Sequence, residues 1–318
     1  MHAILLSAAV LLLSMLPARS ATGPWLTDFS RARLLAKEEG KVLLLDFTGS
    51  DWCAWCIRLR KEVFDQPAFE KDAPGKFVLV ELDYPKDTAK LPEATVTQNK
   101  ELLERYPVTG YPTVLLCDPE GCPFAATGYR EGGAAAYLPH LDALIARRKH
   151  RDDGLAEAAG LDGVAKARAL IAVLDGLELP GAMVRIHYRE VLAQIQAADP
   201  SDETGFARKQ ADEVRLARFL EQLGRFRSEG DLDGALEMIE RTLADPEVTG
   251  GFRQQVQGHR AGSLAYADRD DEAIAVLQAA VAEAPDGEHT KELADFIKVL
   301  ERKKAGLPLK EPAKTGAE

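Results

Sequence analysis

The residues best suited to chemistry are two cysteines spaced by two positions, Cys53 and Cys56. They follow an apolar run, residues 41–47, and precede residues 57–64, which have helical spacing. Cys53 is therefore expected at a helix N-terminus, where unpaired backbone N–H groups and the helix dipole favour thiolate over thiol. Cys56 lies one turn further, within disulfide reach. This pattern predicts thiol–disulfide exchange, in which one thiolate attacks a disulfide and its neighbour resolves the mixed disulfide.

The elements that must position this pair are predicted from apolar patterns and turn signals in the first half of the chain. We expect helices over residues 25–40, from Cys53 to about Asp65, over 97–106 with Thr97 as its cap, and over 132–150, with strands at 41–47, 76–83, 113–117 and 122–128. The sequence D-P-E-G at 118–121 predicts a turn, so the last two strands form an antiparallel hairpin. This order predicts an α/β fold with a hairpin at the sheet edge.

Two other interpretations of the cysteine pair remain open: a static disulfide, and half of a zinc site completed by Cys117 and Cys122. In the expected fold Cys117 lies five residues along a strand from Pro112, roughly 16 Å at ~3.3 Å per residue, which disfavours shared coordination. Ile57 follows Cys56 where haem attachment needs histidine. The six histidines show no metal-ligand spacing. We therefore expect neither a metal nor a cofactor.

The sequence W-C-A-W-C after an apolar strand, with Y-P-T ahead of a hairpin, resembles the thioredoxin superfamily, and F-T-G-S-D-W-C resembles its exported bacterial thioredoxin-like branch. The resemblance covers residues 25–150. It implies that Cys53 is the nucleophile and Cys56 the resolving cysteine. Pro112 corresponds to the cis-proline that faces the dithiol, and the backbone of Tyr111 would pair with an extended substrate segment.

Three further residues, Asp46, Trp52 and Trp55, are expected near the site. Asp46 resembles the buried acid that assists proton transfer from the resolving thiol, and desolvation would raise the pKa of such a carboxyl. Trp52 and Trp55 bracket the dithiol, where one packs against the turn and the other forms an apolar rim for substrates, or both are structural.

Cys117 and Cys122 flank the hairpin turn. They form a structural disulfide, or else Cys117 is a buried apolar residue and Cys122 a free thiol.

The start of the chain and its charge limit the location and the partners. Residues 3–16 are apolar, Pro17 follows, and Ala18-Arg19-Ser20 has the small residues that a signal peptidase recognises, so we expect export to the periplasm or another extracytoplasmic space. The apolar stretch falls short of the ~20 residues that span a bilayer, so stable membrane insertion after signal removal is not expected. A net charge of −11 argues against nucleic acid as a partner.

The second half of the chain is alanine-rich and predicted to be helical. Residues 230–243 and 268–281 align without gaps, with Ala235 matching Ala273 at a spacing of 38, and they resemble tetratricopeptide repeats. The expected organisation is a signal peptide at 1–20, a thioredoxin-like domain at 21–150, a linker at 151–164, a helical repeat domain at 165–302 and a disordered tail at 303–318.

The sequence therefore predicts an exported thiol–disulfide oxidoreductase that acts on protein thiols and disulfides, in a direction that the motif leaves open. Its helical repeats are expected to bind a partner protein. The alternative is a non-catalytic, chaperone-like interaction protein that uses the thioredoxin-like domain as a binding module.

Overall fold

A computed structural model describes residues 24–308, which form two compact units divided between Pro200 and Ser201. The expected signal peptide lies outside the described residues. Of the expected tail, residues 303–304 belong to the last helix, and residues 309–318 lie outside the description. Within residues 24–308, no helix is long and apolar enough to cross a bilayer.

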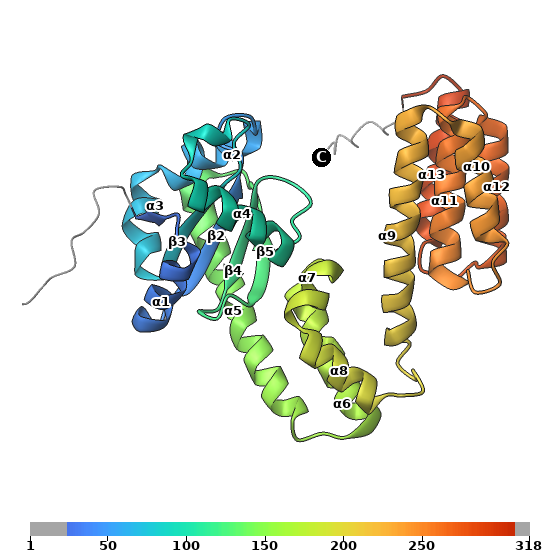
Figure 1. Cartoon of the computed structure of the whole chain (residues 1–318). Coiled ribbons are helices and arrows are strands. Elements are labelled where there is room, and N and C mark those ends of the chain that lie inside the picture. Colours follow the sequence, from blue (N-terminus) through green and yellow to red (C-terminus); the bar gives the residue numbers. More distant parts are fainter. Residues whose placement is uncertain (1–23, 309–318) are drawn as a thin grey trace, which may run out of the picture. The chain divides into compact units, whose positions relative to one another are not determined.

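The first unit is built on a five-stranded sheet with the strand order β1-β3-β2-β4-β5 (Figure 1). The strands are β1 (Trp25–Leu26), β2 (Val42–Thr48), β3 (Phe77–Asp83), β4 (Thr113–Cys117) and β5 (Pro123–Thr127). All seven residues of the central strand β2 are buried, as its unbroken apolar run predicts, and β2 pairs parallel with β3 and antiparallel with β4. The predicted hairpin of β4 and β5 is confirmed.

Helices cover both faces of this sheet. One of them begins later in the chain than predicted, and another begins earlier. The helices are α1 (Phe29–Glu39), α2 (Ala54–Leu59), a π-helix (Arg60–Phe64), α3 (Pro67–Asp72), α4 (Glu93–Arg105) and α5 (Gly133–Ala158), with short 3-10 turns at Ala73–Gly75 and Thr88–Lys90. The helix expected from residue 25 begins at Phe29, because Trp25–Leu26 pair with β3. The predicted cap at Thr97 is wrong, because α4 already begins at Glu93.

The structure also differs from the expected linker at residues 151–164. Helix α5 continues through Ala158, and α6 (Gly163–Leu177), α7 (Gly181–His187) and α8 (Arg189–Ala198) complete the first unit. Gly154, which the sequence suggests as a break, lies inside α5, where an added Cβ would be 2.5 Å from Val173 Cγ2. This glycine marks a close approach between α5 and α6.

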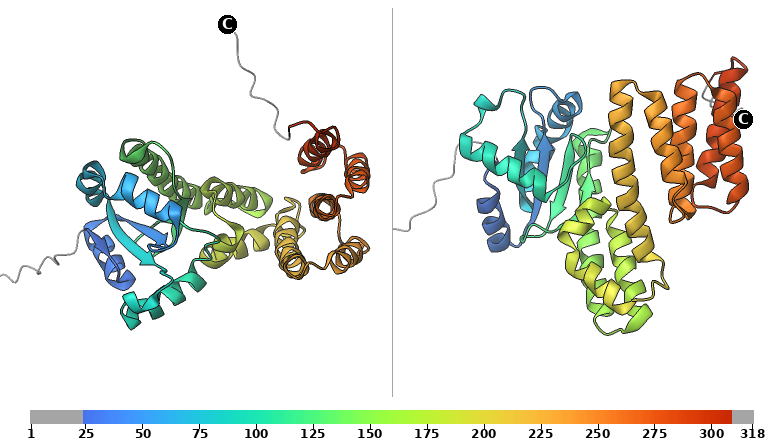
Figure 2. Two further views of the ribbon diagram at one scale, coloured as in Figure 1. Left: turned by 90° about the horizontal axis from the view of Figure 1, so that it is seen from above. Right: turned by 45° about the vertical axis from the view of Figure 1, so that its right-hand side comes forward.

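The second unit consists of helices and turns throughout its described residues, 201–308. The helices are α9 (Phe206–Glu229), α10 (Leu232–Leu243), α11 (Gly250–Tyr266), α12 (Asp270–Glu283) and α13 (Thr290–Lys304), and consecutive helices stand side by side (Figures 1 and 2).

Helices α9, α11 and α13 end in the same way. Gly230, Asp268 and Gly306, each 38 residues from the next, have left-handed φ values of 70°, 56° and 66°. The next backbone amide donates in each case to the carbonyl five residues earlier, at 2.9, 3.0 and 2.9 Å. The spacing of 38 residues therefore recurs at three helix ends.

Candidate active site

The two cysteines lie at the start of α2, as predicted. Cys53 is the N-cap residue, its Sγ accepts a hydrogen bond from Cys56 N at 3.1 Å, and the two side chains form a disulfide with their Cα atoms 5.2 Å apart. The Cys53 amide donates to Gly49 O at 2.9 Å. In the reduced protein, the amide that now contacts Cys53 Sγ and the positive end of the helix dipole favour the Cys53 thiolate.

The turn between β2 and the disulfide is held by Trp52 and by the end of β3. Trp52 Nε1 donates to Tyr84 O at 2.8 Å, and Asp83 accepts from Ser50 N at 2.9 Å and from Ser50 Oγ at 2.6 Å. A Cβ at Gly49 would lie 2.5 Å from the Trp52 ring. Trp52 is thus the tryptophan that packs against the turn, and Gly49 leaves the space that its ring occupies.

The loop before β4 lies beside this turn. The Tyr111–Pro112 peptide bond is cis, and Thr113 pairs with Phe47 in β2. The Tyr111 ring packs edge-on against the Trp52 ring, with the ring centroids 5.5 Å apart. Sequence positions almost sixty residues apart therefore meet at one end of the sheet, where the resemblance to thioredoxins places them.

Asp46 is a buried carboxyl in β2. It pairs in register with Glu81 in β3 and Val114 in β4, it is 2% exposed, and its Oδ1 has no hydrogen-bond partner among residues 24–308. Burial raises the pKa of Asp46 to about 7, the positive charge of Arg60 opposes this rise, and the carboxylates of Glu81 and Asp83 add to it. A carboxyl with this pKa can take up and release a proton near neutral pH.

Trp55 forms an exposed aromatic cluster that the sequence did not predict. Its side chain is 54% exposed, its ring centroid lies 5.2 Å from that of Tyr129, and the Arg58 guanidinium lies 5.5 Å from the Trp55 centroid and 4.9 Å from the Tyr129 centroid. Glu62 accepts from Arg58 Nε and from the Tyr129 hydroxyl, both at 2.7 Å. The only sequence signal for this cluster is the i,i+4 spacing of Arg58 and Glu62.

Of the two interpretations of Cys117 and Cys122, the structure excludes the disulfide and agrees with the other, because both are free cysteines and Cys117 is buried. A register shift between Leu116 and Cys117 places Pro123 opposite Cys117, and the Cys122 thiol instead lies 3.9 Å from the His187 carbonyl. Burial raises the pKa of both thiols, which keeps them protonated and poorly nucleophilic. Within residues 24–308, no three histidine, cysteine or acidic side chains are placed to hold a metal ion.

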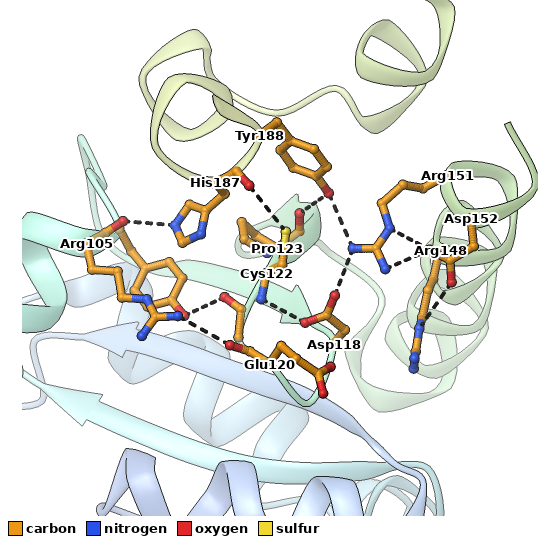
Figure 3. Close-up of polar contacts among 12 residues, drawn as sticks. Arg105, Asp118, Glu120, Cys122, Pro123, Arg148, Arg151, Asp152, His187 and Tyr188 are labelled. Atoms are coloured by element: carbon orange, nitrogen blue, oxygen red, sulfur yellow. Dashed lines mark hydrogen bonds and ion pairs between the residues drawn. The ribbon is translucent and has the colours of Figure 1, made fainter. Parts of the chain in front are cut away.

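A second buried polar cluster lies at the end of β4 away from Pro112 (Figure 3). Asp118 accepts from Cys122 N at 2.8 Å and from Arg151 at 2.9 Å. The Tyr188 hydroxyl donates to Pro123 O at 2.7 Å and accepts from Arg151 at 3.5 Å. These contacts join α5 and the start of α8 to the hairpin turn. The cluster does not cover the end of the sheet that carries the disulfide.

The first unit is similar to proteins of a known family. A family model described as a thioredoxin-like domain matches residues 29–143. The chain is 33% identical over 132 residues to the disulfide bond reductase DsbH of Chlamydia pneumoniae, a match that covers 42% of this chain and 78% of DsbH. It is 32% identical over 130 residues to the thioredoxin-related protein DsbJ of Chlamydia pneumoniae, covering 39% of this chain and 37% of DsbJ.

A solved structure of a DsbH oxidoreductase is also similar, at 32% identity, with 43% of this chain and 94% of that chain covered and a TM-score of 0.37. The part of the chain matched by the family model contains the disulfide, Asp46 and the cis-proline, and an all-helical region follows it. The chain belongs to the thioredoxin-like family.

Proposed function

We propose that this protein is an exported thiol–disulfide oxidoreductase that reduces disulfides in other proteins and binds a partner protein through its helical second unit. The observation that carries the proposal is the Cys53–Cys56 disulfide at a helix N-terminus, next to a loop with a cis-proline. DsbH, a relative described as a disulfide bond reductase, supports reduction as the direction. The apolar segment before Pro17 supports export.

The proposed reaction transfers two electrons from the dithiol to the substrate. The Cys53 thiolate attacks a substrate disulfide, which forms a bond from Cys53 Sγ to one substrate sulfur and releases the other as a thiolate. Cys56 then loses its proton to Asp46 and attacks Cys53 Sγ. This step frees the second substrate thiol and closes the Cys53–Cys56 disulfide. Asp46 suits this role because its pKa lies near neutral pH.

Substrate binding is assigned to the side chains around the dithiol. In this proposal the backbone of Tyr111 and Pro112 pairs with an extended substrate segment, and Trp52 and Trp55 contact its apolar side chains. The exposed rings of both tryptophans support this role. The same exposed rings would serve the alternative, a binding protein without redox activity, so the activity itself must be tested.

The test is reduction of insulin in the presence of dithiothreitol, followed by turbidity. Wild type should accelerate the reaction and Cys53→Ser should fall to the uncatalysed rate, because the attacking thiolate is lost. Cys122→Ser is the matched control, since it removes a free thiol outside the site and should keep the wild-type rate. Equal rates for wild type and Cys53→Ser would leave only the binding-protein alternative.

The reduction potential of the Cys53–Cys56 pair tests the direction. A reductase should have a potential below about −200 mV, whereas an oxidant lies near about −120 mV. Equilibration with glutathione, read out by alkylation and mass, measures this value.

The helical unit is proposed to be a tetratricopeptide-like array in which α9–α10 and α11–α12 are pairs and α13 corresponds to the first helix of a pair. The helix ends spaced by 38 residues support this arrangement. Leu223, Ala261 and Val299 occupy equivalent positions; the first two are buried and Val299 is 37% exposed. Among residues 24–308 no helix comes after α13, and within this range Val299 is accordingly less covered than its counterparts.

A further inference from the structure

The spacing of 38 residues makes two junctions of the helical unit equivalent. In the first junction, the turn between α9 and α10 adjoins the last turns of α11, and in the second, the turn between α11 and α12 adjoins the last turns of α13 (Figure 1). The backbone of the two turns is alike, with Gly230 and Asp268 both left-handed. Side chains therefore decide what each junction can bind.

The second junction is closed by its own side chains. Leu300 of α13 is buried there. Lys303 Nζ lies 3.0 Å from Asp268 Oδ1 and 3.1 Å from Asp270 Oδ1 and joins the last turn of α13 to the α11–α12 turn. At this junction the chain itself fills the apolar space and pairs the charged side chains.

The first junction has an open pocket of about 440 Å³ at the equivalent positions. Gly262 replaces Leu300, and a Cβ on Gly262 would meet no atom within 4 Å. Leu232 replaces Asp270, and Tyr266, which is 91% exposed, replaces Lys304. The pocket is lined by Phe226, Leu232, Ala235, Gly262, Ser263 and Tyr266, among others.

Two polar groups at this pocket lack partners. The Ser263 hydroxyl is buried, in a residue that is 4% exposed, and has no hydrogen-bond partner among residues 24–308. Arg227 also lines the pocket and has no carboxylate partner in the same described range. Asp231, the nearby acid, already caps α10 by accepting from Gly234 N at 2.8 Å. Arg227 is therefore the charged side chain of the lining that has no hydrogen-bond or ion-pair partner in the described range, whereas Asp231 is already held as the helix cap.

We propose that the first junction binds a segment of a partner protein that presents a large apolar side chain, aromatic or aliphatic, next to a carboxylate. The apolar side chain fills the space above Gly262, and the carboxylate pairs with Arg227. The exposed ring of Tyr266 at the rim offers contact to residues that flank the anchor, which favours a chain segment over a free small molecule. This inference rests on the proposed binding of a partner protein by the helical unit.

The probe is a short fluorescein-labelled peptide of glycine and serine with Glu-Phe-Glu at its centre, titrated with the full chain by fluorescence polarisation. The peptide should bind, and replacing its phenylalanine with alanine or both glutamates with glutamine should weaken binding at least about tenfold. Gly262→Leu, which copies the closed junction, should weaken binding by a similar factor. Gly224→Leu is the matched control, because Gly224 lies in α9 outside the pocket and its Cβ would also meet no atom within 4 Å.

Arg227→Gln, a change at an exposed position, keeps the test valid if Gly262→Leu fails to fold. It should weaken binding of the Glu-Phe-Glu peptide and leave the glutamine peptide unaffected. The proposal is overturned if the peptide does not bind, if Gly262→Leu and Gly224→Leu bind it equally, or if only N-acetylphenylalanine binds in ligand-detected NMR. The peptide contains no cysteine, so this result and the redox test of Cys53 succeed or fail independently.

Discussion

Asp46 and Asp118 are buried near opposite ends of the sheet, and their surroundings differ. Asp118, at the far end of β4, has a partner for each carboxylate oxygen: Cys122 N for Oδ1 and Arg151 for Oδ2. Asp46, toward the disulfide end of β2, has an Oδ1 without a partner among residues 24–308 and a pKa raised to about 7. One carboxyl is held as a charged structural group, and the other keeps a proton that can move.

In the proposed mechanism, this difference separates a carboxyl that stabilises the domain from one that takes part in proton transfer. A buried carboxylate with a complete set of partners fixes the geometry around it, and removing a partner is costly. A buried carboxyl without a complete set of partners weakens the fold once it is ionised, but it can act as a base near neutral pH. The predictions below test the two ends separately.

The largest expected effect is at the structural end. Arg151→Ala leaves the Asp118 carboxylate buried without its counter-charge and should lower the free energy of unfolding by about 3–5 kcal/mol. Urea unfolding followed by tryptophan fluorescence reports on the first unit alone, because all three tryptophans lie at residues 25–55.

Arg148→Ala is the matched control for this change. Arg148 lies 3.7 Å from Asp152 in an exposed pair, so its loss should cost less than about 1 kcal/mol. Similar losses of unfolding free energy in Arg151→Ala and Arg148→Ala would show that the buried contact of Arg151 with Asp118 stabilises the protein no more than an exposed ion pair does.

A smaller effect of opposite sign is expected at the disulfide end. The pKa of Asp46 in the folded protein lies above its value of 3.8 in the unfolded chain, so the folded state binds the extra proton, and stability falls as pH rises from about 4 to about 7. Asp46→Asn removes this penalty and should be more stable than wild type by roughly 3 kcal/mol at pH 6, with little difference below pH 4. Urea unfolding at several pH values measures the effect.

The same variant should reduce insulin more slowly, because its amide cannot accept the proton of Cys56. A variant that gains no stability at pH 6, or that works at the wild-type rate across pH 5 to 9, would remove Asp46 from the proposed mechanism.

The smallest effect is expected at Cys122. Its thiol makes weak contacts, among them one of 3.9 Å with the His187 carbonyl, so Cys122→Ala should change the free energy of unfolding by less than about 1 kcal/mol. Alkylation of the oxidised, unfolded wild type should label two thiols, Cys117 and Cys122, and this is read from the intact mass. An intact mass without the label would instead mean that Cys117 and Cys122 are joined by a disulfide.

The dithiol end could be predicted because its signals are local. The apolar run of β2, the spacing of Cys53 and Cys56 and the Tyr-Pro-Thr sequence each lie within a few residues, and the structure places them together. The hydrogen bond of Trp52 and the cluster around Trp55 depend on Tyr84 and Tyr129, which no local pattern connects to the cysteines.

The structural end could not be predicted, because its contacts join residues far apart in the chain. Arg151 and Asp118 are 33 positions apart, and the run Arg-Asp-Asp-Gly that begins at Arg151 has the composition of an exposed linker. Gly154 breaks the helical pattern in the sequence, yet in the structure its missing side chain makes room for Val173. The hairpin disulfide failed as a prediction because one register shift placed Pro123 opposite Cys117.

The contact between the Tyr188 hydroxyl and Pro123 O can form only late in the synthesis of the first unit. These residues are 65 positions apart, so a ribosome that adds 5–20 residues per second makes Tyr188 roughly 3–13 s after Pro123. For part of that interval the nascent chain holds Asp118 before Arg151 exists to neutralise it. A stop codon anywhere before Tyr188 would therefore remove a buried hydrogen bond from the same unit that carries the Cys53–Cys56 disulfide.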